Sequence, residues 1–311
     1  MGVAYRNPVH DSYFADPFVM RTDDGYVAVG TGRVVDGLAF EILRSADLVH
    51  WTSVGGALQP PEGVGTDFWA PEVAASGGRW WMYYSVGSGD AGHHLRAAVA
   101  DEPTGPYRDT GVDLTPDERF AIDPHPFQDV DGTWWLFFAH DVLEGERVGT
   151  MLAVRRLVGM TELVGPTVPV LRPSGNWQIY QRGRAMYGQV YDWHTLEGPF
   201  VRRRGGRYHL FYSGGSWQEP TYGVGYAVAD DPQGPWSEPQ LAASLLRTVP
   251  GAVIGPGHNC VVTTPEGLDV VVYHAWDAER TGRRMCIDPL TWTDDGPVLD
   301  GPSHHDTILP R

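Results

Sequence analysis

The chain has 311 residues, of which 42% are hydrophobic and 12% aromatic, so it can bury a large core. Its formal net charge is −16, from 39 acidic and 23 basic residues, which argues against nucleic acid and anionic membranes as partners. The two cysteines imply no disulfide framework. The first residues contain no apolar run typical of a signal peptide, so we expect a cytoplasmic protein, or a secreted one if a leader has been trimmed.

A glycine followed by an aromatic-rich strand recurs five times along the chain. In order, the strands read YVAVGTG, RWWMYYSV, TWWLFFAH, RYHLFYSGG and LDVVVYHAW, after Gly25, Gly78, Gly132, Gly206 and Gly267. The segments 98–107 (AVADEPTGPY) and 227–236 (AVADDPQGPW) occupy equivalent places in the second and fourth repeats. The intervals between successive marker glycines are of the length that is typical of one propeller blade. The sequence therefore predicts an all-β fold, a five-bladed β-propeller of four-stranded antiparallel blades, with residues 1–311 forming one domain.

Five side chains stand nine residues before these glycines. They are Asp16, Trp69, Asp123, Glu197 and His258. Each precedes a short apolar stretch that we expect to be the innermost strand of its blade. If the blades are arranged radially, the five side chains converge at the mouth of the central channel.

Three carboxylates at one mouth would repel one another, so at least one is expected to have a raised pKa. Glycoside hydrolysis needs such a division, because one carboxylic acid protonates the leaving oxygen while a carboxylate activates water or attacks the sugar. Alternatively, Asp16 and Asp123 are strand-entry residues, since each precedes a proline and Asp-Pro is a common turn dipeptide. Three carboxylates at one repeat position favour the catalytic interpretation.

The third interval is longer than the others and contains an insertion at residues 172–191, just before Glu197. Its Trp, Tyr, Gln and Arg content, which includes Trp177, fits either a loop that lines a sugar pocket or an ordinary surface loop. A bulky insertion here could also close one end of a cleft and enforce cleavage from the chain end.

The motifs ADPFV, FWAPEV, IDPHPF, EGPF with RRRGGRYHLFYSGG, and GPGHN stand in an order that resembles glycoside hydrolase family 43, the five-bladed propeller glycosidases of hemicellulose and arabinan. The resemblance covers about residues 10 to 295. It implies that Asp16 is the general base, Asp123 the carboxylate that orients the acid and tunes its pKa, and Glu197 the general acid. It also implies inversion of configuration, with Asp16 activating a water molecule.

Within that family, the sequence favours removal of terminal α-L-arabinofuranosyl residues from hemicellulose- or arabinan-derived oligosaccharides. This preference follows from the absence of a C-terminal β-sandwich of the kind that many β-xylosidases of the family carry, and from EGPF where internally cutting members often read EAPY. The alternatives are a β-xylosidase or a galactofuranosidase of the same fold. The oligomeric state is not predicted.

The resemblance also suggests further site residues. Phe68 and Trp69 match the aromatic stretch that borders the sugar pocket, and His94 is expected at the pocket rim. Arg247 is either a contact to substrate or a solvent-exposed side chain. His258 resembles the histidine that faces a calcium ion in many members; the alternative is a pocket histidine held by its neighbours.

The sequence argues against three other classes of propeller protein. A non-catalytic sugar-binding propeller is expected to lose a carboxylate at the shared position, and none is missing here. A phosphorolytic enzyme needs several cations aimed at phosphate, but the consecutive arginines 202–204 alternate across a strand. A scaffolding propeller has no reason to gather acids at its channel. The hydrolase is therefore the favoured interpretation.

Overall fold

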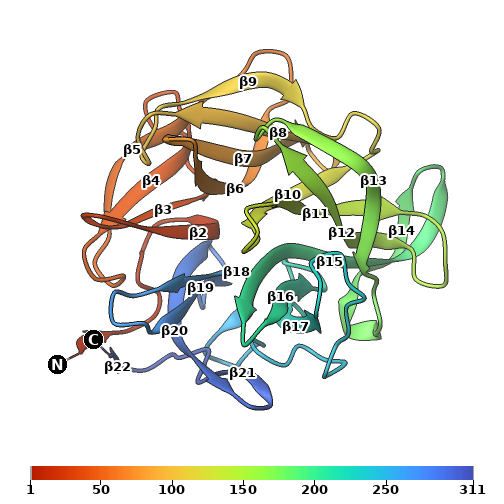
Figure 1. The fold of residues 1–311 in the computed structure, drawn as a ribbon. Helices are drawn as coiled ribbons and strands as arrows, with labels where there is room; N and C mark the ends of the chain where they lie inside the picture. The colour runs from red at the N-terminus through yellow and green to blue at the C-terminus, as the bar shows by residue number, and fades with distance from the viewer. Residues whose placement is uncertain (1, 311) are drawn as a thin grey trace.

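A computed structural model describes residues 2–310 and shows five antiparallel sheets arranged radially around a central axis (Figure 1). Blade 1 comprises β2 (Phe14–Thr22), β3 (Gly25–Gly32), β4 (Ala39–Ser45) and β5 (Thr52–Gln59). Blade 2 comprises β6 (Asp67–Ser76), β7 (Arg79–Ser88), β8 (Ala91–Ala100) and β9 (Tyr107–Asp113). Blade 3 comprises β10 (Ala121–Gln128), β11 (Trp134–Val142), β12 (Gly149–Val158) and β13 (Glu162–Leu171).

Blade 4 departs from the four-stranded pattern. It comprises β15 (Gln189–Arg204), β16 (Arg207–Gly214) and β17 (Gly223–Ala229), and isolated bridges from Val228 to Ser237 and from Val224 to Leu246 stand where the fourth strand would lie. Blade 5 comprises β18 (Ile254–Thr263), β19 (Asp269–Trp276), β20 (Arg283–Thr293) and β21 (Gly296–Leu299). The predicted five-bladed, all-β propeller is confirmed.

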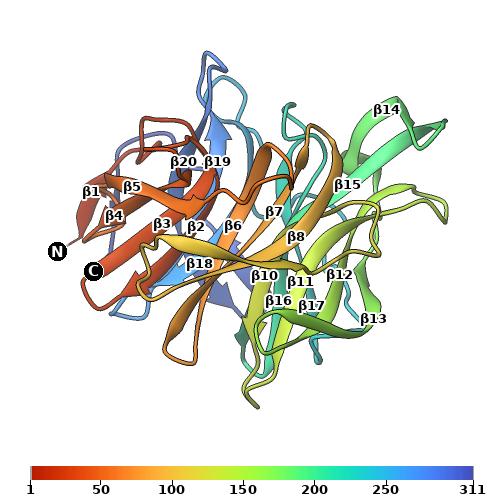
Figure 2. The same cartoon turned by 90° about the horizontal axis from the view of Figure 1, so that it is seen from above.

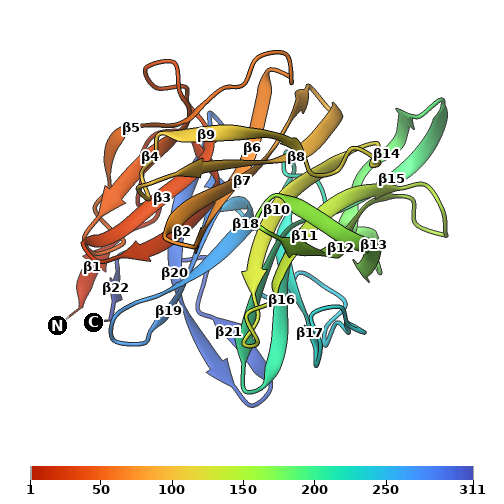
Figure 3. The ribbon, with the colours of Figure 1, turned by 45° about the horizontal axis from the view of Figure 1, so that its top comes forward.

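One element projects from this ring. A 3₁₀ turn, η1 (Asn176–Gln178), leads into β14 (Ile179–Met186), which pairs with the first part of β15. Figures 2 and 3 show the resulting hairpin extending beyond the blades. Because β15 is 16 residues long, the same strand forms half of this hairpin and then the innermost strand of blade 4.

The two chain ends meet beside blade 5 (Figure 1). There β1 (Val3–Tyr5) pairs with β22 (Thr307–Leu309). The buried carboxylate of Asp288 accepts hydrogen bonds from the Tyr5 and Tyr273 hydroxyls, at 3.0 and 2.8 Å, and from the Ser303 N–H at 3.0 Å. These bonds satisfy a buried carboxylate and tie both ends of the chain to the last blade, which helps to hold the ring closed.

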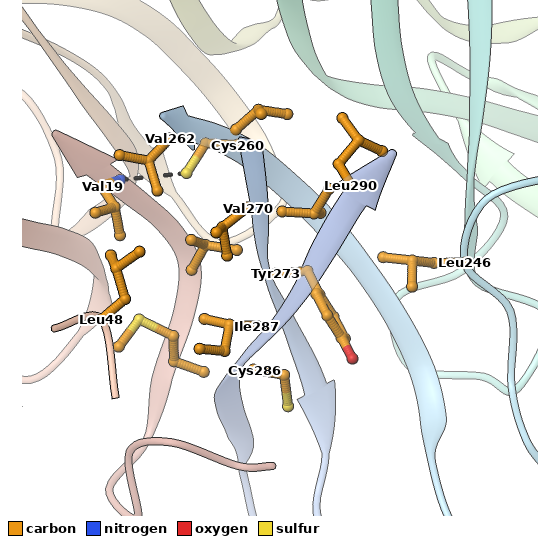
Figure 4. Close-up of a cluster of buried hydrophobic side chains, with 14 of the residues drawn as sticks. Val19, Leu48, Leu246, Cys260, Val262, Val270, Tyr273, Cys286, Ile287 and Leu290 are labelled. Atoms are coloured by element: carbon orange, nitrogen blue, oxygen red, sulfur yellow. Dashed lines mark hydrogen bonds between the residues drawn. The ribbon is translucent and has the colours of Figure 1, made fainter. Parts of the chain in front are cut away.

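A buried apolar cluster joins blade 5 to blade 1 (Figure 4). It includes many β-branched side chains, such as Val262, Val270 and Ile287, which strands packed on both faces favour. The Cys260 thiol lies within it and accepts a hydrogen bond from the Val19 N–H at 3.2 Å. Within residues 2–310, no helix has the length and apolarity needed to cross a membrane.

Candidate active site

The innermost strand of every blade carries a β-bulge near its start. Each of the five strands shifts register there, and in each a residue at the bulge adopts a positive φ. Those residues are Asp16 (48°), Ala70 (46°), Asp123 (58°), Gly198 (57°) and His258 (49°). A bulge re-aims a side chain at a sheet edge, so this repeated kink is what directs side chains into the channel mouth.

This pattern corrects the predicted equivalence of the five repeats. Asp16, Asp123 and His258 do share one position, but Trp69 and Glu197 each lie one residue before the bulge of their blade. The equivalent positions in blades 2 and 4 hold Ala70 and Gly198. A Cβ at Gly198 would lie 3.1 Å from the His258 ring, so the small residue leaves room for that ring.

Four of the bulge N–H groups bond to a side chain of the preceding blade, and these bonds link every pair of adjacent blades except blades 2 and 3. The bonds run from Asp16 to His274 Nδ1 (3.1 Å), from Ala70 to Thr31 Oγ1 (2.7 Å), from Gly198 to Asp123 Oδ2 (2.9 Å) and from His258 to Ser213 Oγ (2.7 Å). A strained backbone persists where its surroundings over-determine it, and these bonds supply that constraint.

The three predicted carboxylates line one pocket of about 270 Å³ at the channel mouth. Asp16, Asp123 and Glu197 are 8%, 6% and 9% exposed. His258 lies among them, with its Nδ1 3.3 Å from Asp16 Oδ1 and 3.9 Å from Asp123 Oδ2. The predicted convergence is therefore confirmed by the geometry.

Asp16 lies beside the guanidinium of Arg283 and the imidazole rings of His258 and His274. Its Oδ1 lies 3.1 Å from Arg283 Nη1. Burial acts to raise the pKa of Asp16, but the Arg283 charge and the neighbouring imidazoles outweigh it and hold this pKa well below its ordinary value. Burial lowers the pKa of His274 to about 4, so this ring is neutral and accepts the Asp16 N–H at Nδ1. Asp16 is thus a carboxylate over the whole ordinary pH range.

The other two carboxyl groups are shifted the opposite way. Burial, together with the charges of Glu197 and Asp16, raises the pKa of Asp123 well above its ordinary value, against the opposing Gly198 N–H bond. Burial raises the pKa of Glu197 to about 7, and the Asp16 charge adds to this rise. The Tyr222 hydroxyl opposes it by donating a 2.5 Å hydrogen bond to Glu197 Oε1. One ionised carboxylate and one protonated acid in one pocket are what acid–base cleavage of a glycoside requires.

Comparisons with known proteins agree with this chemistry. The family described as glycosyl hydrolases family 43 matches residues 5–298. The chain belongs to glycoside hydrolase family 43. It is 28% identical over 94% of its length to a β-D-galactofuranosidase of Aspergillus niger, of which it covers 84%. It is 26% identical over 87% of its length to an extracellular exo-α-(1→5)-L-arabinofuranosidase of Streptomyces chartreusis, of which it covers 82%.

A solved structure of a thermostable family 43 glycoside hydrolase superposes with a TM-score of 0.87 at 31% identity, over 99% of both chains. As a family 43 member, the chain is an O-glycosyl hydrolase, and its substrate is a carbohydrate. The curated relatives differ in the sugar that their names state, so membership alone leaves the glycoside open.

Of the substrate-binding residues predicted for this family 43 chain, Trp69 lines the pocket. Its indole stacks on the buried His93 ring, with centroids 3.7 Å apart and planes 19° apart. His93 in turn is fixed by the Gly89 carbonyl at 2.8 Å from Nε2. His94 was expected at the rim, but its neighbour His93 is the residue that supports the pocket wall. His94 points away, and its Nδ1 lies 3.0 Å from Asp113 Oδ2.

The other three predicted contacts lie outside the pocket lining. Phe68 packs edge-to-face on Phe40 in the core between blades 1 and 2, because its strand turns it to the opposite side from Trp69. Trp177 packs against Tyr212, with centroids 6.2 Å apart. Arg247 is exposed, as in the alternative interpretation. The family resemblance indicated Phe68 and the composition of the insertion indicated Trp177, but neither pattern determines the direction of a side chain.

Residues that the sequence did not single out form much of the pocket. Arg283 binds Asp16 and also lies over the Trp217 ring, 4.3 Å from its centroid, while the Tyr13 hydroxyl accepts a 2.7 Å bond from Arg283 Nη2. No motif marked them, because they come from three separate segments. The insertion at 172–191, in contrast, was marked: Tyr180 and Arg184 of β14 line the pocket, which confirms the pocket-lining alternative.

His258 is the residue for which a calcium ion was predicted. Calcium takes about six to eight oxygen ligands, whereas His258 offers one nitrogen beside two carboxylates that already face Arg283 and Gly198. Within residues 2–310, no group of three or more His, Cys, Asp or Glu side chains is arranged to hold a metal ion. The residues present therefore do not fit a calcium ion held directly by protein. The ion stays a prediction, and the chemistry of the carboxylates does not require it.

Proposed function

We propose that this family 43 enzyme is an inverting glycosidase that removes terminal α-L-arabinofuranosyl residues from arabinan- or hemicellulose-derived oligosaccharides. The observation that carries the proposal is the opposed ionisation of Asp16 and Glu197 in one small pocket. A volume of about 270 Å³ is below the roughly 300–1,000 Å³ of sites for drug-sized ligands, which favours a terminal sugar over an internal stretch of polymer.

In the proposed mechanism, ionised Asp16 takes a proton from a water molecule as that water attacks the anomeric carbon. Glu197 delivers its proton to the glycosidic oxygen as the bond to the leaving sugar breaks. Asp123 bonds the Gly198 N–H, adjacent to Glu197 in the chain, and so orients the acid. Burial and the negative charge of Asp16 raise the pKa of Glu197 to about 7, so the acid is protonated below neutral pH.

The test is hydrolysis of aryl α-L-arabinofuranoside, β-D-xyloside and β-D-galactofuranoside by the same preparation. We expect turnover of the arabinofuranoside. Proton NMR should show that the sugar is first released with the anomeric configuration opposite to that of the substrate. The 28% identity to a named β-D-galactofuranosidase makes that glycoside the second candidate. Preferential turnover of another glycoside would overturn the sugar assignment, and a retained anomer would overturn the role of Asp16. Binding of sugars without turnover would identify a non-catalytic propeller.

The Tyr222→Phe variant tests the acid assignment through pH. The Tyr222 hydroxyl stabilises ionised Glu197, so removing it should raise the pKa of Glu197. Because the acid works only while protonated, the alkaline limb of kcat/KM, expected near pH 7 in the wild type, should move up by about one pH unit. Tyr226→Phe is the control, since that hydroxyl bonds the Asp295 carbonyl. An alkaline limb that stays in place would remove Glu197 as the titrating acid.

A further inference from the structure

The pocket extends beyond the three carboxylates into a second half with its own polar groups. Three elements form it: the turn between β7 and β8, the adjacent ends of β11 and β12, and the β14–β15 hairpin. They contribute Asp90 from the turn, Asp141 and Thr150 from blade 3, and Tyr180 and Arg184 from β14. The mechanism proposed above uses none of these side chains.

Arg184 is held in place from two sides. Its Nη2 donates a 3.0 Å hydrogen bond to Asp90 Oδ2, across from the hairpin to blade 2. Its guanidinium lies over two rings of the hairpin, 4.7 Å from the Tyr180 centroid and 5.6 Å from the Trp193 centroid. The side chain is only 15% exposed. A guanidinium stacked and paired in this way is pre-organised, so a ligand that binds it has little side-chain entropy to remove.

Arg184 also keeps hydrogen-bonding capacity. Among residues 2–310, Asp90 is the one side chain that accepts a hydrogen bond from its guanidinium, which has five N–H donors. Asp141, in the same half of the pocket, is fixed by the Thr150 hydroxyl at 2.8 Å and the Tyr187 hydroxyl at 2.7 Å, and a carboxylate has further acceptor sites. One cation between two carboxylates suits a neutral ligand with several hydroxyls and disfavours an anion such as phosphate.

The position of the second half of the pocket relative to Glu197 indicates which part of a substrate binds there. Thr195 and Glu197 lie two residues apart on β15, on the same face, and both line the pocket. The same strand continues from Thr195 into the hairpin that carries Arg184. Glu197 must lie next to the glycosidic oxygen that it protonates, so the side of the pocket continuous with Glu197 is the side of the leaving group.

We propose that Arg184, fixed by Asp90 and Tyr180 and facing the same space as Asp141, forms a subsite for the leaving-group sugar and binds the hydroxyls of the unit next to the cleaved bond. This inference rests on the proposed glycosidase function and adds to it the binding of the leaving-group sugar. Arg184 is a specificity-determining residue in this scheme, because it distinguishes a sugar leaving group from an aryl one.

The test uses two substrates that carry the same terminal sugar, namely the sugar that the wild type hydrolyses best. One substrate is a disaccharide of that sugar, and the other is its 4-nitrophenyl glycoside. Arg184→Met keeps a long unbranched side chain and removes every N–H donor. We expect kcat/KM on the disaccharide to fall about 10- to 100-fold, because one or two charge-assisted hydrogen bonds to the leaving sugar are lost. On the aryl glycoside we expect less than about a threefold change in kcat/KM. Arg184→Lys should recover only part of the loss, since an ammonium group lacks the planar fork.

Arg182→Met is the matched control. Arg182 lies on the same hairpin and also pairs with an aspartate, Asp192, but it lies outside this pocket. We expect both substrates to be unaffected. A second, independent readout is titration of catalytically silent Asp16→Asn with the disaccharide and with the free monosaccharide. The extra affinity for the disaccharide should disappear when Arg184→Met is added.

Three results would overturn the subsite. Equal losses on both substrates would mean that Arg184 supports the catalytic half. Unchanged kinetics on both would mean that it binds nothing. If Arg184→Met gained activity on longer oligosaccharides and cut them internally, the hairpin would be a barrier to long substrates, and Arg184 would hold that hairpin in place. A wild type that neither binds nor cleaves any sugar would instead contradict the proposed function itself, so the two failures are distinguishable.

Discussion

Asp16→Asn is expected to lower kcat/KM about 10²- to 10⁴-fold for every substrate, whether its leaving group is poor or activated. The reason is that every substrate needs an activated water molecule, whatever its leaving group, and an amide cannot accept the proton from that water. The substitution preserves volume, and the amide oxygen can still accept the bond from Arg283 Nη1. We therefore expect binding of oligosaccharides to survive, measured by calorimetric titration alongside the rates.

The control for this variant is Asp11→Asn, which changes an exposed aspartate five residues earlier in the chain. It should leave rates and melting temperature unchanged. Asp16→Asn also removes the negative charge that faces the buried Arg283 guanidinium, so some loss of thermal stability is expected. Near-normal turnover by folded Asp16→Asn would exclude Asp16 as the base, and loss of sugar binding together with turnover would leave it only a structural role.

Repetition explains how much of this site was predictable. The five glycine markers gave the blade number, and the position nine residues earlier gave Asp16, Asp123 and His258, because blades 1, 3 and 5 share one spacing from bulge to marker. In blades 2 and 4 the turns are Gly77-Gly78 and Gly205-Gly206, with both glycines at positive φ. The marker there is one residue closer to the bulge than in the other three blades, so the alignment reached Trp69 and Glu197 in place of Ala70 and Gly198.

The one-residue difference has a chemical consequence. Residues at the bulge itself point to the axis, and there Asp16 and Asp123 both lie near His258. Glu197 precedes its bulge, lies beside Tyr222 and continues into the hairpin strand. The bulge thus places the acid in a different environment from the base, which fits the different pKa shifts of the two groups.

What the sequence did not predict depends on side-chain direction and on contacts between distant segments. Phe68 and Trp69 are neighbours of similar composition, yet strand alternation sends one to the core and the other to the pocket. Arg283 lies 267 residues from Asp16 in the chain, and no local pattern links them. Such pairs are fixed by the closure of the ring, which brings blade 5 against blade 1.

Glu197→Gln is expected to separate substrates by leaving group. On a disaccharide, kcat/KM should fall about 10²- to 10⁴-fold, because the departing sugar oxygen needs a proton. On a 2,4-dinitrophenyl glycoside of the same sugar it should fall less than about tenfold, since that leaving group departs as an anion. Gln can still accept the Tyr222 hydroxyl bond, so the pocket is expected to stay intact.

The pH profile of the same variant gives a second, independent check. The wild type should lose activity as pH rises through the raised pKa of Glu197, about 7, because only the protonated acid is active. With Gln at this position nothing titrates there, so the residual activity on the dinitrophenyl glycoside should stay level across that range. Glu219→Gln, at an exposed glutamate, should keep the wild-type profile. Equal losses on both glycosides, or an alkaline limb that persists in Glu197→Gln, would assign the acid to the other half of the coupled pair, Asp123.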